Sequence, residues 1–84
     1  MPTALIAEDE PLLAEELAEA LARLWPELAI VARARDGIDA LRLVDEHRPD
    51  AAFLDIQMPG MSCLEVAQQV GGRTHVVFVT AYDQ

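Results

Sequence analysis

The chain contains no lysine and only a few positive charges, which limits the partners it can bind. All six of its basic residues are arginine, against 15 Asp and Glu, so the formal net charge is −9. A nucleic-acid surface needs clustered Lys and Arg, and this balance therefore argues against direct nucleic-acid contact. A cation site or a basic partner fits the charge better.

Disulfides, membrane spans and leader peptides are also missing. The single cysteine, Cys63, excludes an internal disulfide and favours a reducing compartment such as the cytoplasm. No apolar run approaches the roughly 18–20 residues of a membrane span, and the N-terminus lacks the charged region and long apolar core of a signal peptide. We therefore expect one small cytoplasmic domain without membrane contact.

Short apolar runs alternate with amphipathic stretches and predict the order βαβαβαβ. Continuous apolar runs are typical of strands buried on both faces, and apolar residues three and four apart are typical of helices. Strands that alternate with helices predict a parallel sheet with helices on both faces. The predicted strands are 4–7, 28–34, 51–55 and 75–80, and the predicted helices are about 11–24, 37–47 and 63–70.

Each predicted helix has an apolar stripe and end signals. Pro11 suits a first helical turn, and Trp25 is expected to pack at a helix end or in the core. Ser62 is a plausible N-cap, with Glu65 three residues later in a capping-box arrangement. The stripes expected to face the core are Leu13, Leu17, Ala20, Leu21 and Leu24, then Ile38, Leu41, Leu43 and Val44, then Leu64, Val66, Ala67 and Val70.

Polar residues stand where three predicted strands end. Glu8 and Asp9 follow the first strand, Asp55 ends the third and Thr80 ends the fourth. In a parallel sheet these positions share one edge, which is where ligands bind in open α/β sheets. Neighbouring carboxylates repel unless a cation lies among them, and Mg²⁺ prefers such oxygen ligands together with phosphate oxygens. Asp55 is then a candidate nucleophile that forms an aspartyl phosphate, with the Thr80 hydroxyl donating to a phosphoryl oxygen.

A simpler interpretation of each of these residues stays open. Asp55 can be a solvent-facing acid in a strand-to-loop turn. Glu8 and Asp9 can be acids stabilised by the dipole of the following helix. Thr80 can be an ordinary β-branched strand residue.

The segments "AEDEP", "PDAAFLDIQMPGM", "LEV" and "VFVTAYDQ" together resemble the receiver domain of a two-component response regulator. "FVTAYDQ" is most similar to the receivers of LytTR-type transcriptional regulators. The resemblance runs along essentially the whole chain. It implies a flavodoxin-like sheet of strand order 2-1-3-4-5 and a phosphorylation switch that is not an enzyme. It also implies a sensor histidine kinase as partner and a DNA-binding output downstream.

The resemblance also implies a role for each matching residue. Asp55 matches the phosphoacceptor and is one ligand of Mg²⁺ (or Mn²⁺). Asp9 matches the acid that binds the metal directly, and Glu8 matches the acid that acts through water. The list is completed by the backbone carbonyl of Gln57 as a metal ligand, Thr80 as the switch hydroxyl and Ala81 as the small residue beside the phosphoryl group.

The sequence departs from the family pattern in two places. Cys63 stands where many members have glycine, and we expect a structural role for it. The family's fourth helix, its fifth strand with an invariant lysine, its switch aromatic and its fifth helix do not follow in these 84 residues. Residues 1–84 are therefore expected to be the N-terminal part of one receiver, truncated after strand four. Tyr82 comes too soon after that strand to be the switch aromatic.

Three consequences are expected from the missing parts. Phosphorylation and signal output should be impaired without the lysine, while weak Mg²⁺ binding survives. The fourth strand, "VVFV", should be an exposed apolar edge. We expect homo-oligomers through that edge or through the uncovered sheet face.

Two other functional classes compete with the switch. A phosphatase or hydrolase of the aspartyl-phosphate type needs an acid two residues after its nucleophile, and Gln57 stands there instead. A pseudo-receiver or interaction module without phosphotransfer is disfavoured by the presence of Asp9, Asp55 and Thr80. The missing lysine keeps that last alternative open for this chain.

Overall fold

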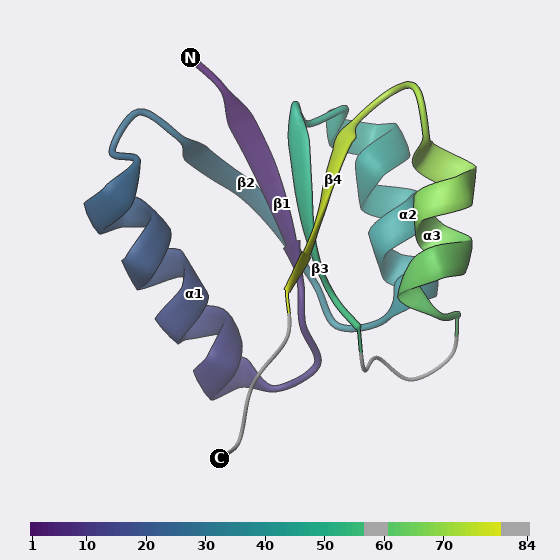
Figure 1. The fold of residues 1–84 in the computed structure, drawn as a ribbon, viewed down its shortest axis with the longest axis horizontal. Coiled ribbons are helices and arrows are strands. Elements are labelled where there is room, and N and C mark those ends of the chain that lie inside the picture. The colour runs from purple at the N-terminus through teal and green to yellow at the C-terminus, as the bar shows by residue number, and fades with distance from the viewer. Residues whose placement is uncertain (57–60, 80–84) are drawn as a thin grey trace.

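The structure is a computed structural model that describes residues 1–56 and 61–79. Its elements follow the predicted order (Figure 1). The strands pair in parallel in the order β2-β1-β3-β4, which matches the first four strands of the predicted flavodoxin-like sheet. The elements are β1 (Thr3–Ala7), α1 (Pro11–Leu24), β2 (Ala29–Ala34), α2 (Gly37–His47), β3 (Ala51–Asp55), α3 (Cys63–Val70) and β4 (His75–Val79).

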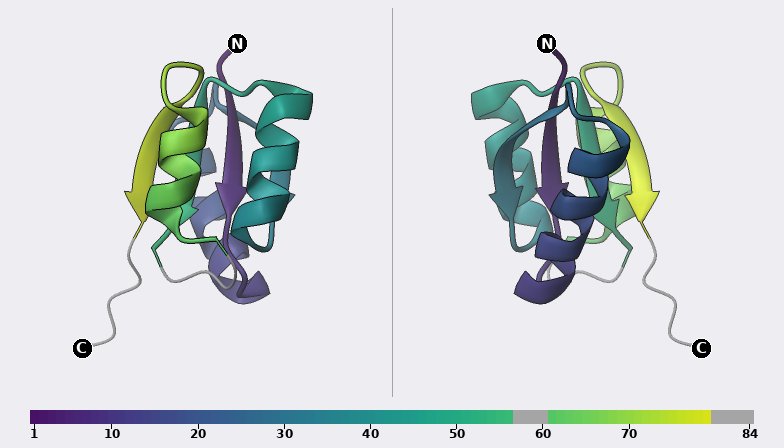
Figure 2. Two further views of the ribbon diagram at one scale, coloured as in Figure 1. Left: turned by 90° about the vertical axis from the view of Figure 1, so that its right-hand side faces the viewer. Right: turned by 90° about the vertical axis from the view of Figure 1, so that its left-hand side faces the viewer.

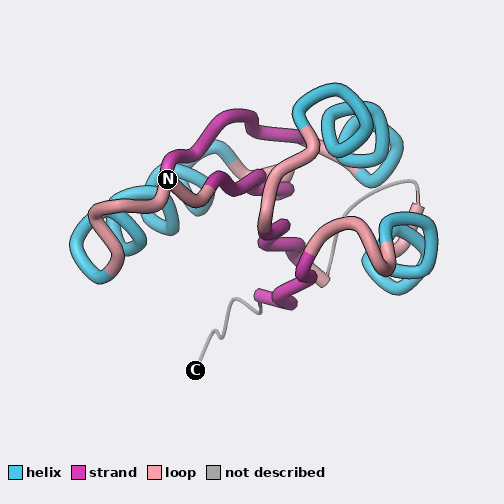
Figure 3. The backbone as a smooth tube through the Cα atoms, turned by 90° about the horizontal axis from the view of Figure 1, so that it is seen from above, coloured by secondary structure: helices cyan, strands magenta, loops and turns pink. Residues whose placement is uncertain are grey.

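Helices cover both faces of the sheet, as predicted. Helix α1 lies on one face, and α2 and α3 lie on the other (Figures 1 and 3). The central strands are buried on both faces, since Leu5 of β1 belongs to the core under α2 and α3 while Ile6 belongs to the core under α1. All four strands point toward the same end of the molecule (Figure 2), so their carboxyl ends form one edge.

The helix ends follow the sequence signals closely. The Asp36 side chain accepts the N–H of Asp39 at 2.7 Å and caps α2. The predicted capping box is present at α3, where Glu65 N–H donates to Ser62 Oγ at 3.2 Å and Ser62 N–H donates to Glu65 Oε1 at 3.0 Å. Cys63 is buried in the core under α3, which confirms its structural role.

The predicted buried faces of the helices are partly wrong. Leu24, Ile38 and Leu64 are 82%, 65% and 64% exposed, so they do not belong to the core. Small residues take their place against the sheet, as Ala40 does in α2 and Ala14 does in α1. Short side chains let a helix approach the sheet closely, and the longer side chains then point outward.

The first residue of α2, Gly37, lies close to Met61, which precedes α3. A Cβ at Gly37 would lie 2.5 Å from the backbone oxygen of Met61, so only glycine fits there without a shift.

Trp25 is the C-cap residue of α1 and is 42% exposed, which confirms helix-end packing and not a core position.

Candidate metal and phosphoacceptor site

The three predicted carboxylates meet at the carboxyl edge of the sheet. Glu8 and Asp9 follow β1, and Asp55 is the last residue of the adjacent strand β3. The parallel ladder extends past β1, because Glu8 N–H donates to the Ala34 carbonyl at 2.9 Å. One carboxylate oxygen from each of the three residues lies within 4.8 Å of the others. The sequence prediction that strand ends bring these acids together is confirmed in its geometry, while their roles stay predictions.

Two of these acids are buried without a compensating cation. Asp55 and Glu8 are 7% and 8% exposed, whereas Asp9 is exposed. Within residues 1–56 and 61–79, none of the three forms an ion pair with an arginine or histidine. A buried carboxylate without a partner is costly, and the usual remedies are a bound proton or a bound cation.

The pKa of Glu8 is shifted by its burial and by the neighbouring acids. Burial, aided by the charge of Asp55, raises the pKa of Glu8 to about 7 from an ordinary value of 4.5. The Glu10 N–H opposes the shift by donating to Glu8 Oε2 at 3.0 Å. Near pH 7 the carboxyl group is therefore partly protonated, and a cation at this place would compete with that proton.

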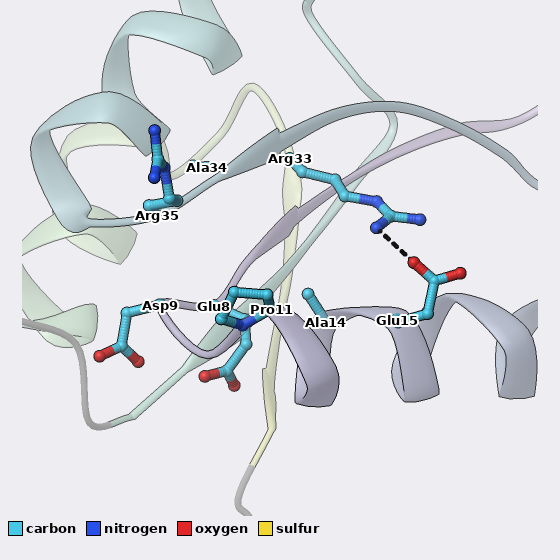
Figure 4. A pocket seen from close by; sticks show the side chains of 8 residues that line it. All are labelled: Glu8, Asp9, Pro11, Ala14, Glu15, Arg33, Ala34 and Arg35. Atoms are coloured by element: carbon cyan, nitrogen blue, oxygen red, sulfur yellow. Dashed lines mark hydrogen bonds and ion pairs between the residues drawn. The ribbon is translucent and has the colours of Figure 1, made fainter.

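An open hollow of about 360 Å³ lies beside Glu8, between α1 and the end of β2 (Figure 4). Arg33 spans it and binds Glu15 at 3.0 Å, while Arg35 points away from Glu8 and Asp9. The two arginines of the hollow thus leave the acidic cluster uncompensated. Sequence reasoning missed the Arg33–Glu15 pair, because a contact between a strand and a helix has no fixed spacing in sequence.

Three predicted site residues are Gln57, Thr80 and Ala81, and they lie outside the described residues. Their proposed roles remain predictions. The strand that leads to Thr80 is in register with the site, because Val79 is the β4 partner of Asp55. In the part of the chain that the structure describes, no helix is long and apolar enough to cross a membrane.

Fold and site together define a parallel α/β domain with an acidic cluster at the carboxyl ends of its central strands. Residues 4–84 match the family model described as the response regulator receiver domain. Among curated proteins, the chain is 49% identical to an uncharacterised response regulatory protein of Vibrio cholerae, covering 98% of this chain and 33% of that protein. It is 40% identical to the positive alginate biosynthesis regulatory protein of Pseudomonas aeruginosa, covering 95% of this chain and 34% of that protein.

Solved structures agree with this match. The signal receiver domain of NarL from Mycobacterium tuberculosis superposes with a TM-score of 0.87 at 36% identity, covering 99% of this chain and 68% of that one. The receiver domain of AraT, a response regulator from Geobacillus stearothermophilus, gives 0.84 at 33% identity, covering 96% of this chain and 65% of that one.

The chain therefore belongs to the response regulator receiver domain family. It spans about a third of the length of the curated relatives it matches.

Proposed function

We propose that this domain is a phosphoacceptor switch in a two-component phosphorelay and that Asp55 accepts the phosphoryl group. The observation that carries the proposal is the meeting of Asp55 with Glu8 and Asp9 at the carboxyl edge. The Asp55 carboxylate attacks the phosphorus of a phosphohistidine, a new P–O bond forms and the P–N bond breaks. Formation of the aspartyl phosphate then shifts a conformational equilibrium of the domain.

The donor set fits a divalent cation that prefers oxygen ligands. Three carboxylates with oxygens within 4.8 Å supply hard ligands, and the buried Glu8 and Asp55 form no ion pair within residues 1–56 and 61–79. Asp9 and Asp55 would hold Mg²⁺ (or Mn²⁺) directly with the Gln57 carbonyl, and Glu8 would act through water. The metal would neutralise charge during phosphoryl transfer.

The partner and output follow from the same proposal. A sensor histidine kinase in the cytoplasm donates the phosphoryl group, and the domain itself is not an enzyme. Two Salmonella relatives at 39% identity are named transcriptional regulatory proteins, which supports a transcriptional output. The LytTR type of that output is proposed from the wording of "FVTAYDQ" alone. The net charge of −9 favours placing DNA contact outside these 84 residues.

The absence of lysine from these 84 residues favours slow phosphorylation over fast. When the 84-residue polypeptide is tested by itself, no lysine ammonium is available to bind the phosphoryl oxygens, so we expect weak Mg²⁺ binding and impaired switching of that polypeptide. The same observation supports the second candidate function, an interaction module without phosphotransfer.

Intact mass after incubation with acetyl phosphate separates these candidates. We expect slow gain of one phosphoryl group in the presence of Mg²⁺ and no gain once a chelator removes the metal. Rapid, complete labelling would contradict the expected impairment. No labelling in either condition would favour the interaction module.

A further inference from the structure

A second hollow, of about 240 Å³, lies between the end of α2 and the turn that follows α3. This is the amino end of the sheet, opposite the acidic cluster, because Thr74 of that turn directly precedes the first residue of β4. The hollow is lined by the buried residues Val44 and Thr74 and by the exposed residues Arg48 and Arg73. All four precede β4, so two arginines border one small hollow that is formed without the outer edge of that strand.

The backbone of Arg48 is in the left-handed region, with φ 48° and ψ 58°. Among the described residues it is the one non-glycine residue with a positive φ. Glycine or asparagine usually occupies this position at a helix end, because a larger side chain is strained there. The backbone N–H of Arg48 caps α2 by donating to the Val44 carbonyl at 2.8 Å, and a glycine would supply the same bond. The cap therefore does not explain an arginine side chain at this position.

The guanidinium of Arg48 is also not used in an ion pair. Within residues 1–56 and 61–79, the arginines that pair with an acid are Arg33, Arg42 and Arg73. A strained residue that is kept without a role in the fold is a candidate for a functional one. The side chain of Arg48 is thus available to a ligand in the hollow.

Arg73, on the other side of the hollow, is oriented by its neighbours but only weakly neutralised. Its Nη2 donates to the Gln69 carbonyl at 3.1 Å, and its Nη1 lies 3.6 Å from Asp45 Oδ1. A strong charge-assisted hydrogen bond is shorter, at about 2.7–2.9 Å. The side chains of Arg73 and Asp45 are 56% and 73% exposed, so this pair contributes little. An anion in the hollow would compete with Asp45 on favourable terms.

We propose that the hollow between Arg48 and Arg73 binds a phosphate group. Two guanidinium groups match the charge of a phosphate dianion better than that of a single carboxylate, and each can bind two phosphate oxygens at once. Pockets for drug-sized ligands occupy roughly 300–1,000 Å³, so a hollow of about 240 Å³ suits a phosphate ion or the phosphate end of a small ester. The proposal does not depend on a metal or on phosphorylation at Asp55.

Titration of the ¹⁵N-labelled 84-residue chain with sodium phosphate tests the site, with a chelator present and ionic strength held constant. We expect saturable shifts of the Nε–Hε signals of Arg48 and Arg73 and of the Thr74 amide. Sodium acetate should bind at least about tenfold more weakly, because it carries one charge. Glycerol phosphate distinguishes the two sources of the phosphate group: tighter binding than phosphate would support an ester, and equal or weaker binding would support the free ion.

Arg48→Gly removes the guanidinium and keeps a residue that adopts a positive φ without strain. We expect at least about a tenfold loss of phosphate affinity and no decrease in the urea concentration at the unfolding midpoint. The matched control is Arg23→Ala, which removes the same charge from the last turn of α1, on the other face of the sheet. Its phosphate affinity should equal that of the unsubstituted chain.

Four results would overturn the proposal. The first is a phosphate titration of the unsubstituted chain without saturable shifts at Arg48 and Arg73, a readout that needs no variant to fold. The second is an affinity that Arg48→Gly leaves unchanged. The third is an equal loss in Arg23→Ala, which would attribute binding to overall charge, and the fourth is acetate binding as tight as phosphate binding.

Discussion

Strand β3 has an aspartate beside each end, and the two carboxylates differ in their surroundings. Asp50 lies just before the strand, and its carboxylate is hydrogen-bonded within the fold. Its Oδ2 accepts the Thr3 N–H at 2.8 Å and the Thr3 hydroxyl at 3.4 Å. Its own N–H and C=O bind Thr3 and His75. Asp55, at the far end, is nearly buried and lies among other acids, without an ion pair in the described residues.

The contrast separates Asp50, whose carboxylate is bound within the fold, from Asp55, which we propose as a ligand-binding carboxylate. At the amino edge the polar groups satisfy one another, as Thr74 Oγ1 also does by donating to the Pro49 carbonyl at 3.0 Å. At the carboxyl edge Glu8 is pushed toward its protonated form. A protein keeps such an unfavourable arrangement where the cluster binds something, and strongly shifted pKa values concentrate at functional sites.

The largest expected effect is the difference in Mg²⁺ affinity between substitutions at Asp55 and at Asp50. Asp55→Asn removes one proposed direct ligand and should weaken Mg²⁺ binding by about a hundredfold. Asp50→Asn makes the same chemical change at the other end of β3 and should leave the affinity unchanged. Isothermal titration calorimetry on both variants measures this. Equal losses of Mg²⁺ affinity in the two variants would contradict a metal site at the carboxyl edge of the sheet.

The next effect concerns pH and Glu8. Because its pKa is raised from 4.5 to about 7, the folded state holds a proton that the unfolded state releases. The contribution of Glu8 to the free energy of unfolding should therefore fall as pH rises from about 4.5 to about 7, by roughly 3 kcal/mol, and stay level above that.

Glu8→Gln should remove this pH dependence. In urea denaturation without metal, the difference in the free energy of unfolding between the variant and the unsubstituted chain should therefore change between about pH 4.5 and about pH 7. Mg²⁺ should bind more tightly as pH rises, because it displaces the Glu8 proton. Parallel stability profiles of the two proteins would contradict the shifted pKa.

A smaller effect is expected at the amino edge. Asp50→Ala removes the acceptor for the Thr3 N–H and should lower the free energy of unfolding by about 1 kcal/mol. Urea denaturation measures the change, and Mg²⁺ titration of the same variant serves as its control. A loss of metal binding without a loss of stability would reverse the roles assigned to the two ends.

The smallest effect is expected at the hollow beside the site. Arg33→Ala breaks an exposed ion pair with Glu15 and should change stability by less than about 0.5 kcal/mol. Arg42→Ala, which loses the exposed partners Asp39 and Glu46, is the matched control. If Arg33→Ala altered Mg²⁺ affinity, the pair would belong to the site and not only to its rim.

The sequence predicted the parts of the molecule that depend on periodicity and on strand ends. The α1 and β3 bounds agree with the prediction at both ends, and the predicted cap at Ser62 follows local hydrogen bonding that neighbouring residues determine. Asp55 and Asp9 could be placed together because parallel strands bring their carboxyl ends to one edge.

Other features depend on distances that no sequence pattern encodes. Ile38 and Leu64 are apolar at helical spacing, yet they face outward because Ala40 and Val66 already fill the space against the sheet. The pKa of Glu8 depends on its burial and on Asp55, 47 positions later in the sequence by their residue numbers. Such effects arise only once the sheet has formed.

The central claim is that Asp55, and not another carboxylate, accepts a phosphoryl group. The most direct test is intact mass after incubation with acetyl phosphate and Mg²⁺, on the unsubstituted chain, Asp55→Asn and Asp50→Asn. The account predicts slow gain of one phosphoryl group in the unsubstituted chain and in Asp50→Asn, and none in Asp55→Asn. Undiminished labelling of Asp55→Asn would contradict it.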